Sequence, residues 1–460
     1  MNEIVIDVKK HNKRMLFIVW ALAAGIAALA LFLPVPTFLP VSVLEYMRRV
    51  GRWVAFGCVV AFIGYFVGVG FHHGLWRHGI KYAFAHTALE ARLRRQMVEA
   101  GLYIAVMVNG VKMAKLGRIG ITFDKRLQCG TVFIENHIKY HDKFDDLDIS
   151  AALGRRWVLD MQYFDDSEDN IIFEFSDASA DWRFYINSRK EAEKIFDKYL
   201  KNYYLVIDKR FMNNFPLSHI LMTASTGGGK TYAVYTLVYM MFHWEPYARP
   251  ELYFVDMKGS SLMVLGDRMG VDTATNTDEV LALLDRLYAI LEDRKVELAE
   301  KLKTGAIDRD YRDFHMKPVI MIFDEYLDFA EDLAAMPAAD RRPIDKKLGS
   351  IVRLGRQLGV FLWVLCQQSR AEDIPTKIRN NMIFTAVLGN PPPTTYQTAF
   401  GVQNVTTHKL GRGSGLYIYQ GLTQKPSRLD FPTFGRDFDI VNEICAASGV
   451  SRKPRQHPLV

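Results

Sequence analysis

Cysteine is scarce in this sequence of 460 residues, and it follows no pattern. The four cysteines lie far apart and form no CxxC pair: Cys58, Cys129, Cys366 and Cys445. This excludes a disulfide framework and a zinc knuckle, and it suits a reducing compartment. Internal repeats and long low-complexity segments are also lacking, so the length indicates two or three ordinary domains around a large core.

A large excess of one charge is lacking too. The net charge is +7 and the pI is about 9.0, which is compatible with nucleic acid or anionic lipid but selects neither. Only His137 and His141 have a metal-like spacing, and they lie in "FIENHIKYH", which alternates like a strand. Because that spacing needs a helix and at least one further ligand, we do not expect a metal site there.

Two long hydrophobic runs without charge lie near the N-terminus, at residues 15–33 and 53–71. Each is long enough to cross a bilayer as a helix. The alternative for the first run is a cleaved signal peptide, but its apolar part is too long and no clear cleavage site follows. We therefore predict that residues 1–80 form a membrane anchor with two transmembrane helices in contact with lipid.

The basic residues around these runs predict their orientation. Four precede the first run and five follow the second, namely Lys9, Lys10, Lys13 and Arg14, then Arg77, Lys81, Arg92, Arg94 and Arg95. The positive-inside rule therefore favours cytoplasmic termini, although three arginines in the intervening loop weaken the asymmetry. Neither run carries an ionisable residue, so no ion path is indicated. We predict a multi-pass protein of the cell membrane whose soluble part is cytoplasmic.

Residues 81–204 predict a leading helix and a small α+β module. Residues 81–100 have the pattern of a charged helix. Strands are expected at 130–140, 156–164 and 170–177, and a helix at 188–204 closes the module. We interpret the acidic cluster "DDSEDN" at 165–170 as a solvated turn and not as a catalytic carboxylate pair.

Residues 205–435 alternate short apolar runs with longer amphipathic stretches such as 277–302. The runs are "SHILMTA", "ELYFVDMKG", "KPVIMIFDE", "VFLWVLCQQ" and "NMIFTAVLG". Continuous apolar runs are typical of parallel strands buried on both faces. The pattern predicts an α/β fold with a doubly wound parallel sheet, followed by a C-terminal tail at 436–460 that is disordered over its last ten residues.

A glycine-rich turn follows the first of these strands, which we expect to end at Met222. A helix begins near Lys230, and this is the context that a P-loop requires. Backbone N–H groups would then cradle a phosphate at the helix N-terminus, Lys230 would reach the β- and γ-phosphates, and the Thr231 hydroxyl would ligate Mg²⁺. The predicted ATP-binding residues are Ala224, Ser225, Thr226, Gly227, Gly228, Gly229, Lys230 and Thr231.

Ala224 departs from the usual P-loop pattern, which has glycine at that position. Alanine is tolerable there if its φ stays negative. The alternative to a P-loop is a flexible turn between a strand and a helix, without a ligand.

A second motif lies about ninety residues downstream, where "VIMIFDE" ends an apolar strand. Asp324 can hold the Mg²⁺ water shell and Glu325 can polarise the attacking water. Two carboxylates could simply terminate a strand, but two motifs in the right order favour an ATP site. Gln367, at the end of "FLWVLCQQS", could sense the γ-phosphate.

Together, residues 205 to about 430 resemble the FtsK/SpoIIIE/HerA class of hexameric DNA-pumping ATPases. The matching segments are "SHILMTASTGGGKT", "PELYFVDMKGSSL", "LEDRKVEL", "IVRLGRQLGVFLWVLCQQS" and "GRGSGLYIYQG". The resemblance implies a RecA-like motor domain that hydrolyses ATP with Mg²⁺, assembles as a homo-hexamer and moves DNA.

The same resemblance assigns two further residues. Gln367 aligns with a sensor glutamine, while Gln368 stands where an arginine is usual, which puts that contact in doubt. Arg356 lies where an arginine finger would reach the γ-phosphate of the neighbouring subunit. Arg353 is the alternative finger, and both arginines could instead form surface ion pairs.

With two spans and no long linker, the layout resembles the TcpA-type coupling proteins of Gram-positive conjugative elements in particular. This implies a coupling protein that brings relaxase-bound DNA to the transfer channel and pumps it, with relaxase and channel proteins as partners. Alternatives are a chromosome or plasmid partitioning translocase and a non-hydrolysing membrane scaffold. A type VII secretion ATPase shares the motor class but usually has several motor domains in tandem.

Overall fold

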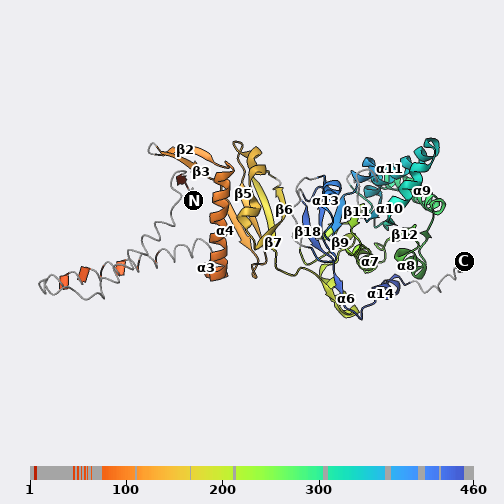
Figure 1. Ribbon diagram of the computed structural model, residues 1–460, viewed down its shortest axis with the longest axis horizontal. Coiled ribbons are helices and arrows are strands. Elements are labelled where there is room, and N and C mark those ends of the chain that lie inside the picture. The colour runs from red at the N-terminus through yellow and green to blue at the C-terminus, as the bar shows by residue number, and fades with distance from the viewer. Residues whose placement is uncertain are drawn as a thin grey trace. The chain divides into compact units, whose positions relative to one another are not determined.

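The computed structural model describes residues 75–449 apart from 109–110, 166, 211–213, 304–308, 368–373, 402–409 and 424–425. It also describes β1 (Val5–Asp7) and a few residues between 45 and 64. The transmembrane helix expected at 15–33 lies outside the described residues, as does most of the one at 53–71. No helix in the described part of the chain is long and apolar enough to span a bilayer. The chain divides into two compact units, residues 1–180 and 181–460 (Figure 1).

The first unit is built on an antiparallel sheet with the strand order β4-β5-β7-β6. Its strands are β4 (Ile119–Phe123), β5 (Cys129–Glu135), β6 (Trp157–Phe164) and β7 (Asn170–Asp177). A smaller sheet contains β1, β3 (Val111–Lys115) and β2 (Ile104–Val108). The helices are α3 (Leu75–His78), α4 (Ile80–Glu99), the 3₁₀ helix η1 (His141–Asp146) and α5 (Ile149–Leu153).

Helix α4 joins this sheet through one buried face. Leu89, Leu93 and Met97 follow a spacing of four residues and are fully buried in the same core as Val132 and Phe173 of the sheet. The predicted leading helix and the strands β6 and β7 are confirmed.

The strand expected at 130–140 is wrong over its last five residues, because β5 ends at Glu135. There the side-chain amide of Asn136 donates to the carbonyl of Glu168 at 2.8 Å, and the chain leaves the sheet. His137 therefore lies in a turn and His141 begins η1.

The second unit is built on a mixed sheet with the strand order β13-β12-β14-β15-β11-β16-β17-β18. The strands are β11 (Ile220–Ala224), β12 (Glu251–Asp256), β13 (Thr273–Ala274), β14 (Val319–Asp324), β15 (Val360–Cys366), β16 (Phe384–Leu388), β17 (Ser414–Tyr419) and β18 (Ser427–Asp430). The strands from β13 to β16 are parallel, whereas β17 and β18 continue the sheet antiparallel. The α/β fold is confirmed, but a wholly parallel sheet is not.

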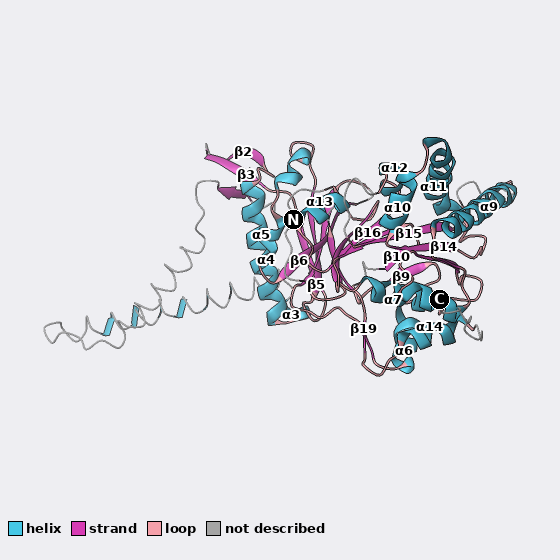
Figure 2. Cartoon of the chain, turned by 45° about the vertical axis from the view of Figure 1, so that its right-hand side comes forward, coloured by secondary structure: helices cyan, strands magenta, loops and turns pink. Residues whose placement is uncertain are grey.

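Helices cover both faces of this sheet (Figure 2). They are α7 (Lys230–Met241), α8 (Ser261–Met269), α9 (Thr277–Leu302), α10 (Tyr326–Ala335), α11 (Ala338–Leu358), α12 (Thr376–Arg379), α13 (Pro393–Phe400) and α14 (Ile440–Ser448). Successive strand residues point to opposite faces: Ile320 and Ile322 pack with α7, α8 and α14, whereas Met321 and Phe323 pack with α9, α10 and α11. Burial on both faces explains why the strands are apolar throughout.

Two helices fall outside the boundaries expected from the sequence. Helix α6 (Arg189–Tyr199), expected in the small module, belongs to the second unit, where Phe196 packs on Tyr239 of α7. Residues 440–448, expected in the tail, form α14. Asp439 caps this helix and Ile444 is fully buried.

Short strand pairs complete the unit: β8 (Tyr185–Ile186) with β19 (Thr433–Phe434), and β9 (Tyr204–Val206) with β10 (Asn214–Pro216).

A buried histidine links the neighbouring strands β11 and β15. His219 Nδ1 accepts a hydrogen bond from the Leu362 amide at 3.0 Å, and the side chain is fully enclosed. Burial lowers the pKa of His219 to about 3. The folded protein therefore holds His219 neutral in a pH range where the unfolded chain would protonate it.

This difference predicts an acid-sensitive stability. The pKa of His219 is depressed in the folded state, so its contribution is fully present above pH 6.5 and is lost as the pH falls toward 3. Between pH 6 and 4, His219 should lower the free energy of unfolding of the wild type by about 1.4 kcal/mol for each pH unit. The variant His219→Asn should lack this decrease. Urea unfolding followed by fluorescence of the buried Trp363 measures this. His315→Asn, at an exposed position, should keep the wild-type slope, and equal slopes for both variants would refute the assignment.

Candidate nucleotide site

The glycine-rich turn between β11 and α7 has the backbone that a phosphate loop requires. Gly227 and Gly229 have φ angles of +78° and +105°, where a side chain would be strained. The Gly228 amide donates to the carbonyl of Ser225 at 2.8 Å, and α7 begins at Lys230. Consecutive amides thus precede a helix N-terminus, which is a site suited to an anion.

A second segment supports this loop from behind. The Gly413 amide donates to the carbonyl of Gly228 at 2.9 Å. A Cβ on Gly229 would lie 2.8 Å from the nitrogen of Gly413, so the two backbones are in direct contact. Gly413 directly precedes β17, in the predicted glycine-rich hairpin. No local sequence pattern indicates that this hairpin contacts the phosphate loop.

Ala224 is the last residue of β11 and pairs with Leu388 of β16. It is not among the residues with a positive φ. Alanine therefore fits at this position without strain, and the condition set for it from the sequence is met.

Lys230 connects the phosphate loop to the end of β14. Its Nζ lies 2.9 Å from Asp324 Oδ1 and 3.5 Å from Glu325 Oε2. β15 separates β11 from β14 in the sheet, so these side chains meet across the carboxyl end of an intervening strand. The structure thus brings together the residues of the two predicted motifs, Lys230 with Asp324 and Glu325.

Glu325 is held in an unusual conformation. Its φ and ψ are +64° and +71°, in the left-handed region that costs a residue with a side chain about 1 kcal/mol or more. Only 5% of the residue is exposed, and its Oε1 accepts a hydrogen bond from the Gln367 amide at 3.2 Å. Gln367 is therefore brought to the site by its backbone, while Gln368 lies outside the described residues.

The second-strand segment "VDMKGSS" contributes two residues that were not predicted for the site. Asp256 is fully buried and accepts hydrogen bonds from the amides of Ser260, Leu262 and Met263, so it fixes the start of α8. Lys258 Nζ lies 3.7 Å from Glu325 Oε2. Because Lys258 is half exposed, this ion pair contributes little to stability.

Arg356 does not lie at the phosphate loop of its own chain. Arg353 and Arg356 are exposed near the C-terminus of α11, directly before β15 begins, and so at the amino edge of the sheet. Tyr419 ends the antiparallel strand β17 at the same edge. Burial raises the pKa of Tyr419, and the nearby positive charge of Arg356 opposes this rise. β15 has seven residues, which separates this edge from the phosphate loop by about 20 Å.

A pocket of about 590 Å³ opens beside the phosphate loop. Thr231, Tyr232, Ser261, Arg412 and Arg436 are among its lining residues. The guanidinium of Arg412 lies 5.3 Å from the centre of the Tyr232 ring. Burial raises the pKa of Tyr235, which also lines the pocket and donates to the carbonyl of Ser261 at 3.0 Å. Sequence reasoning missed Arg412 because its neighbours in the pocket are distant along the chain.

The residues at this edge fit Mg²⁺ better than a metal that needs a protein cage. Within the described residues, no group of three or more His, Cys, Asp or Glu side chains could hold a metal ion. Mg²⁺ does not need such a group, since it binds through one or two protein oxygens together with phosphates and water. Thr231 and Asp324 would supply oxygens of this kind, and Mg²⁺ would neutralise charge on the transferred phosphate.

Two curated bacterial proteins are similar to this chain, while no protein-family model matches it. The FtsK domain-containing protein YdcQ of Bacillus subtilis is 29% identical over 221 residues, which cover 45% of this chain and 44% of YdcQ. The ESX secretion system protein EccC of Thermomonospora curvata is 32% identical over 160 residues, which cover 33% of this chain and 12% of EccC. The chain thus spans less than half the length of these relatives.

Among solved structures, the conjugation coupling protein TcpA of pCW3, in its monomer form with ATPγS, is similar in fold. The match covers 78% of this chain and 99% of TcpA, at 17% identity and a TM-score of 0.46. The chain is thus similar in sequence to an FtsK domain-containing protein, and its Lys230, Asp324 and Glu325 are arranged as a P-loop nucleotide site requires.

Proposed function

We propose that this chain is a membrane-anchored, ATP-driven DNA translocase that acts as the coupling protein of a conjugative element. The main support for ATP hydrolysis is that Lys230, Asp324 and Glu325 lie in contact at one edge of the sheet. The five ordered motifs that resemble DNA-pumping ATPases support DNA as the cargo. The hydrophobic runs at 15–33 and 53–71 support an anchor in the cell membrane, with the termini and the ATPase domain in the cytoplasm.

In this proposal each residue has a defined task. The amides of the phosphate loop other than that of Gly228, together with Lys230, would bind the phosphates, and Asp324 would hold the water shell of Mg²⁺. Glu325 orients the attacking water and accepts its proton. The Gln367 amide holds Glu325 in place. A shift of the end of β15 would therefore move the carboxylate that activates water.

Arg356 would act on the neighbouring subunit of a homo-hexamer. Its position at the amino edge of the sheet, about 20 Å from its own phosphate loop, leaves a trans contact as its route to a γ-phosphate. An arginine supplied in trans stabilises charge in the transition state and makes hydrolysis depend on assembly.

A second candidate cargo is a polypeptide. The observation behind it is the similarity to the secretion protein EccC, at 32% identity over 160 residues. The two cargoes predict different stimulation of the same ATPase. DNA is gripped through its phosphates, so stimulation by DNA should weaken steeply as salt rises.

Lys230→Ala and Glu325→Gln should abolish ATP hydrolysis by different routes. Loss of Lys230 removes a phosphate ligand and should weaken binding of a fluorescent ATP analogue by about tenfold or more. Loss of the Glu325 carboxylate should preserve binding and lower kcat by about a hundredfold or more. Phosphate release with and without duplex and single-stranded DNA, at two salt concentrations, measures both effects.

The matched controls are Lys295→Ala and Glu331→Gln, two exposed positions on α9 and α10. Both should keep the wild-type rate. Normal hydrolysis by Glu325→Gln would exclude Glu325 as the water-activating residue. If a secreted polypeptide but not DNA stimulates hydrolysis by the wild type, the cargo is a polypeptide and not DNA.

Arg356→Ala should also lose hydrolysis while it keeps ATP binding. If the arginine acts in trans, a mixture of Arg356→Ala and Glu325→Gln subunits should recover activity, because some interfaces then combine an intact Glu325 with an intact Arg356. Steady-state hydrolysis across a titration of the two variants measures this recovery. A mixture that stays inactive although it co-assembles would argue against Arg356, and the same experiment with Arg353→Ala tests the alternative finger.

A further inference from the structure

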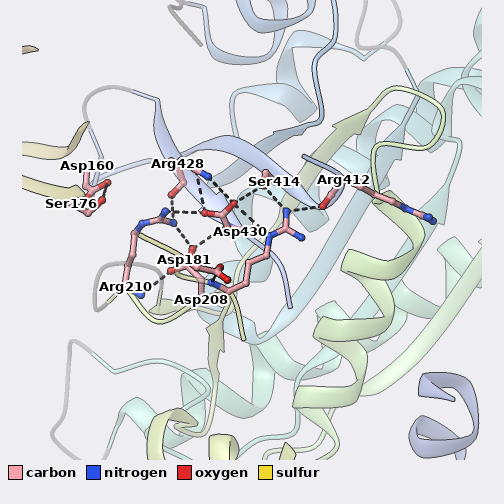
Figure 3. A network of polar contacts seen from close by, with 10 residues as sticks. Asp160, Ser176, Asp181, Asp208, Arg210, Arg412, Ser414, Arg428 and Asp430 are labelled. Carbon is pink, nitrogen blue, oxygen red and sulfur yellow. Dashed lines mark hydrogen bonds and ion pairs between the residues drawn. The ribbon is translucent and has the colours of Figure 1, made fainter. Parts of the chain in front are cut away.

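A network of buried charges joins the segment between β9 and β10 to β18, the strand at one edge of the large sheet (Figure 3). Arg210 donates to Asp208 Oδ2 at 2.6 Å and to Asp430 Oδ2 at 2.9 Å, and all three side chains are at most 4% exposed. Burial alone would raise the pKa of Asp430. Arg210, the Ser414 hydroxyl and Arg428 outweigh it and hold that pKa below its ordinary value. Asp430 therefore stays ionised and fixes the groups around it.

Arg183 extends this network to the hairpin before β17. Its Nη2 donates to the carbonyl of Arg412 at 2.7 Å and to Ser414 Oγ at 2.6 Å. Its Nη1 donates to Thr433 Oγ1 at 3.2 Å, and its Nε lies 3.8 Å from Asp430 Oδ1. Nη2 of one guanidinium thus holds both ends of the segment 412–414, at a position that the shorter lysine side chain would not reach.

This segment is the one that contacts the phosphate loop. Gly413, between the two groups that Arg183 holds, donates its amide to Gly228 and packs against Gly229. Arg412 projects its side chain over Tyr232, beside Thr231. A displacement of residues 412–414 would therefore act on the backbone that cradles phosphate and on the adjoining pocket together.

We propose that Arg183 is a positioning residue of the nucleotide site. It does not touch the phosphate loop, but it fixes the segment 412–414 that supports Gly228 and Gly229. Arg183 follows Asp181, the first residue of the second unit, by two positions. The chain that enters the ATPase domain thus sets the shape of the phosphate loop. This inference rests on the proposed ATP site.

The test is the affinity of the full chain for a fluorescent ATP analogue, together with KM and kcat for ATP. Arg183→Ala should weaken analogue binding and raise KM by about tenfold, while kcat changes by less than about twofold. A purely structural role would instead lower the active fraction, and with it the apparent kcat, at an unchanged KM. Unchanged affinity in folded Arg183→Ala would overturn the proposal.

Arg183→Lys decides the matter if the alanine variant does not fold. Lysine keeps a cation beside Asp430 but loses the fork, so its affinity should fall between those of wild type and alanine. Wild-type affinity in Arg183→Lys would likewise overturn the proposal. Arg189→Ala is the matched control, since its ion pair with Glu443 is exposed and lies away from the segment 412–414. Analogue binding needs no hydrolysis, so a wild type that binds but does not hydrolyse would refute the ATPase and leave this test intact.

Discussion

The arrangement of the candidate site depends on the common edge that parallel strands share. β11, β15 and β14 lie side by side and run in the same direction, so their carboxyl ends meet at one edge. The strands are buried on both faces, so the charged side chains of the site lie where the strands end. Asp256, Asp324 and Gln367 all stand at or directly after such an end, together with the phosphate loop.

This constraint also explains how much the sequence could predict. The strands were found from their apolar runs, and Lys230, Asp324 and Glu325 from their places after those runs. The tail prediction failed at α14, because a short helix needs its tertiary partners and Ile444 finds them only on folding. The strand at 130–140 failed because Asn136 bonds to a distant loop, which no local pattern shows.

The missed parts of the site have a common origin. Arg412, Gly413 and Arg183 are distant in sequence from the phosphate loop. Arg412 and Gly413 act through backbone atoms, namely a carbonyl held by Arg183 and an amide donated to Gly228. A residue that works through its backbone leaves no signature in its side-chain type. The exposed Arg356 was identified only by resemblance. Its place at the far edge of the sheet is a fact of topology that its local sequence does not contain.

The contact between Gly229 and Gly413 makes the phosphate loop a discontinuous motif. A Cβ on Gly229 would collide with the Gly413 nitrogen, and both positions have a positive φ, where a side chain would be strained. Any lineage of this protein that keeps the turn at 227–229 must therefore keep a glycine on the opposite wall as well, however freely the hairpin drifts elsewhere. The two glycines should therefore occur together, and requiring both would distinguish related proteins from chains that share only the phosphate loop.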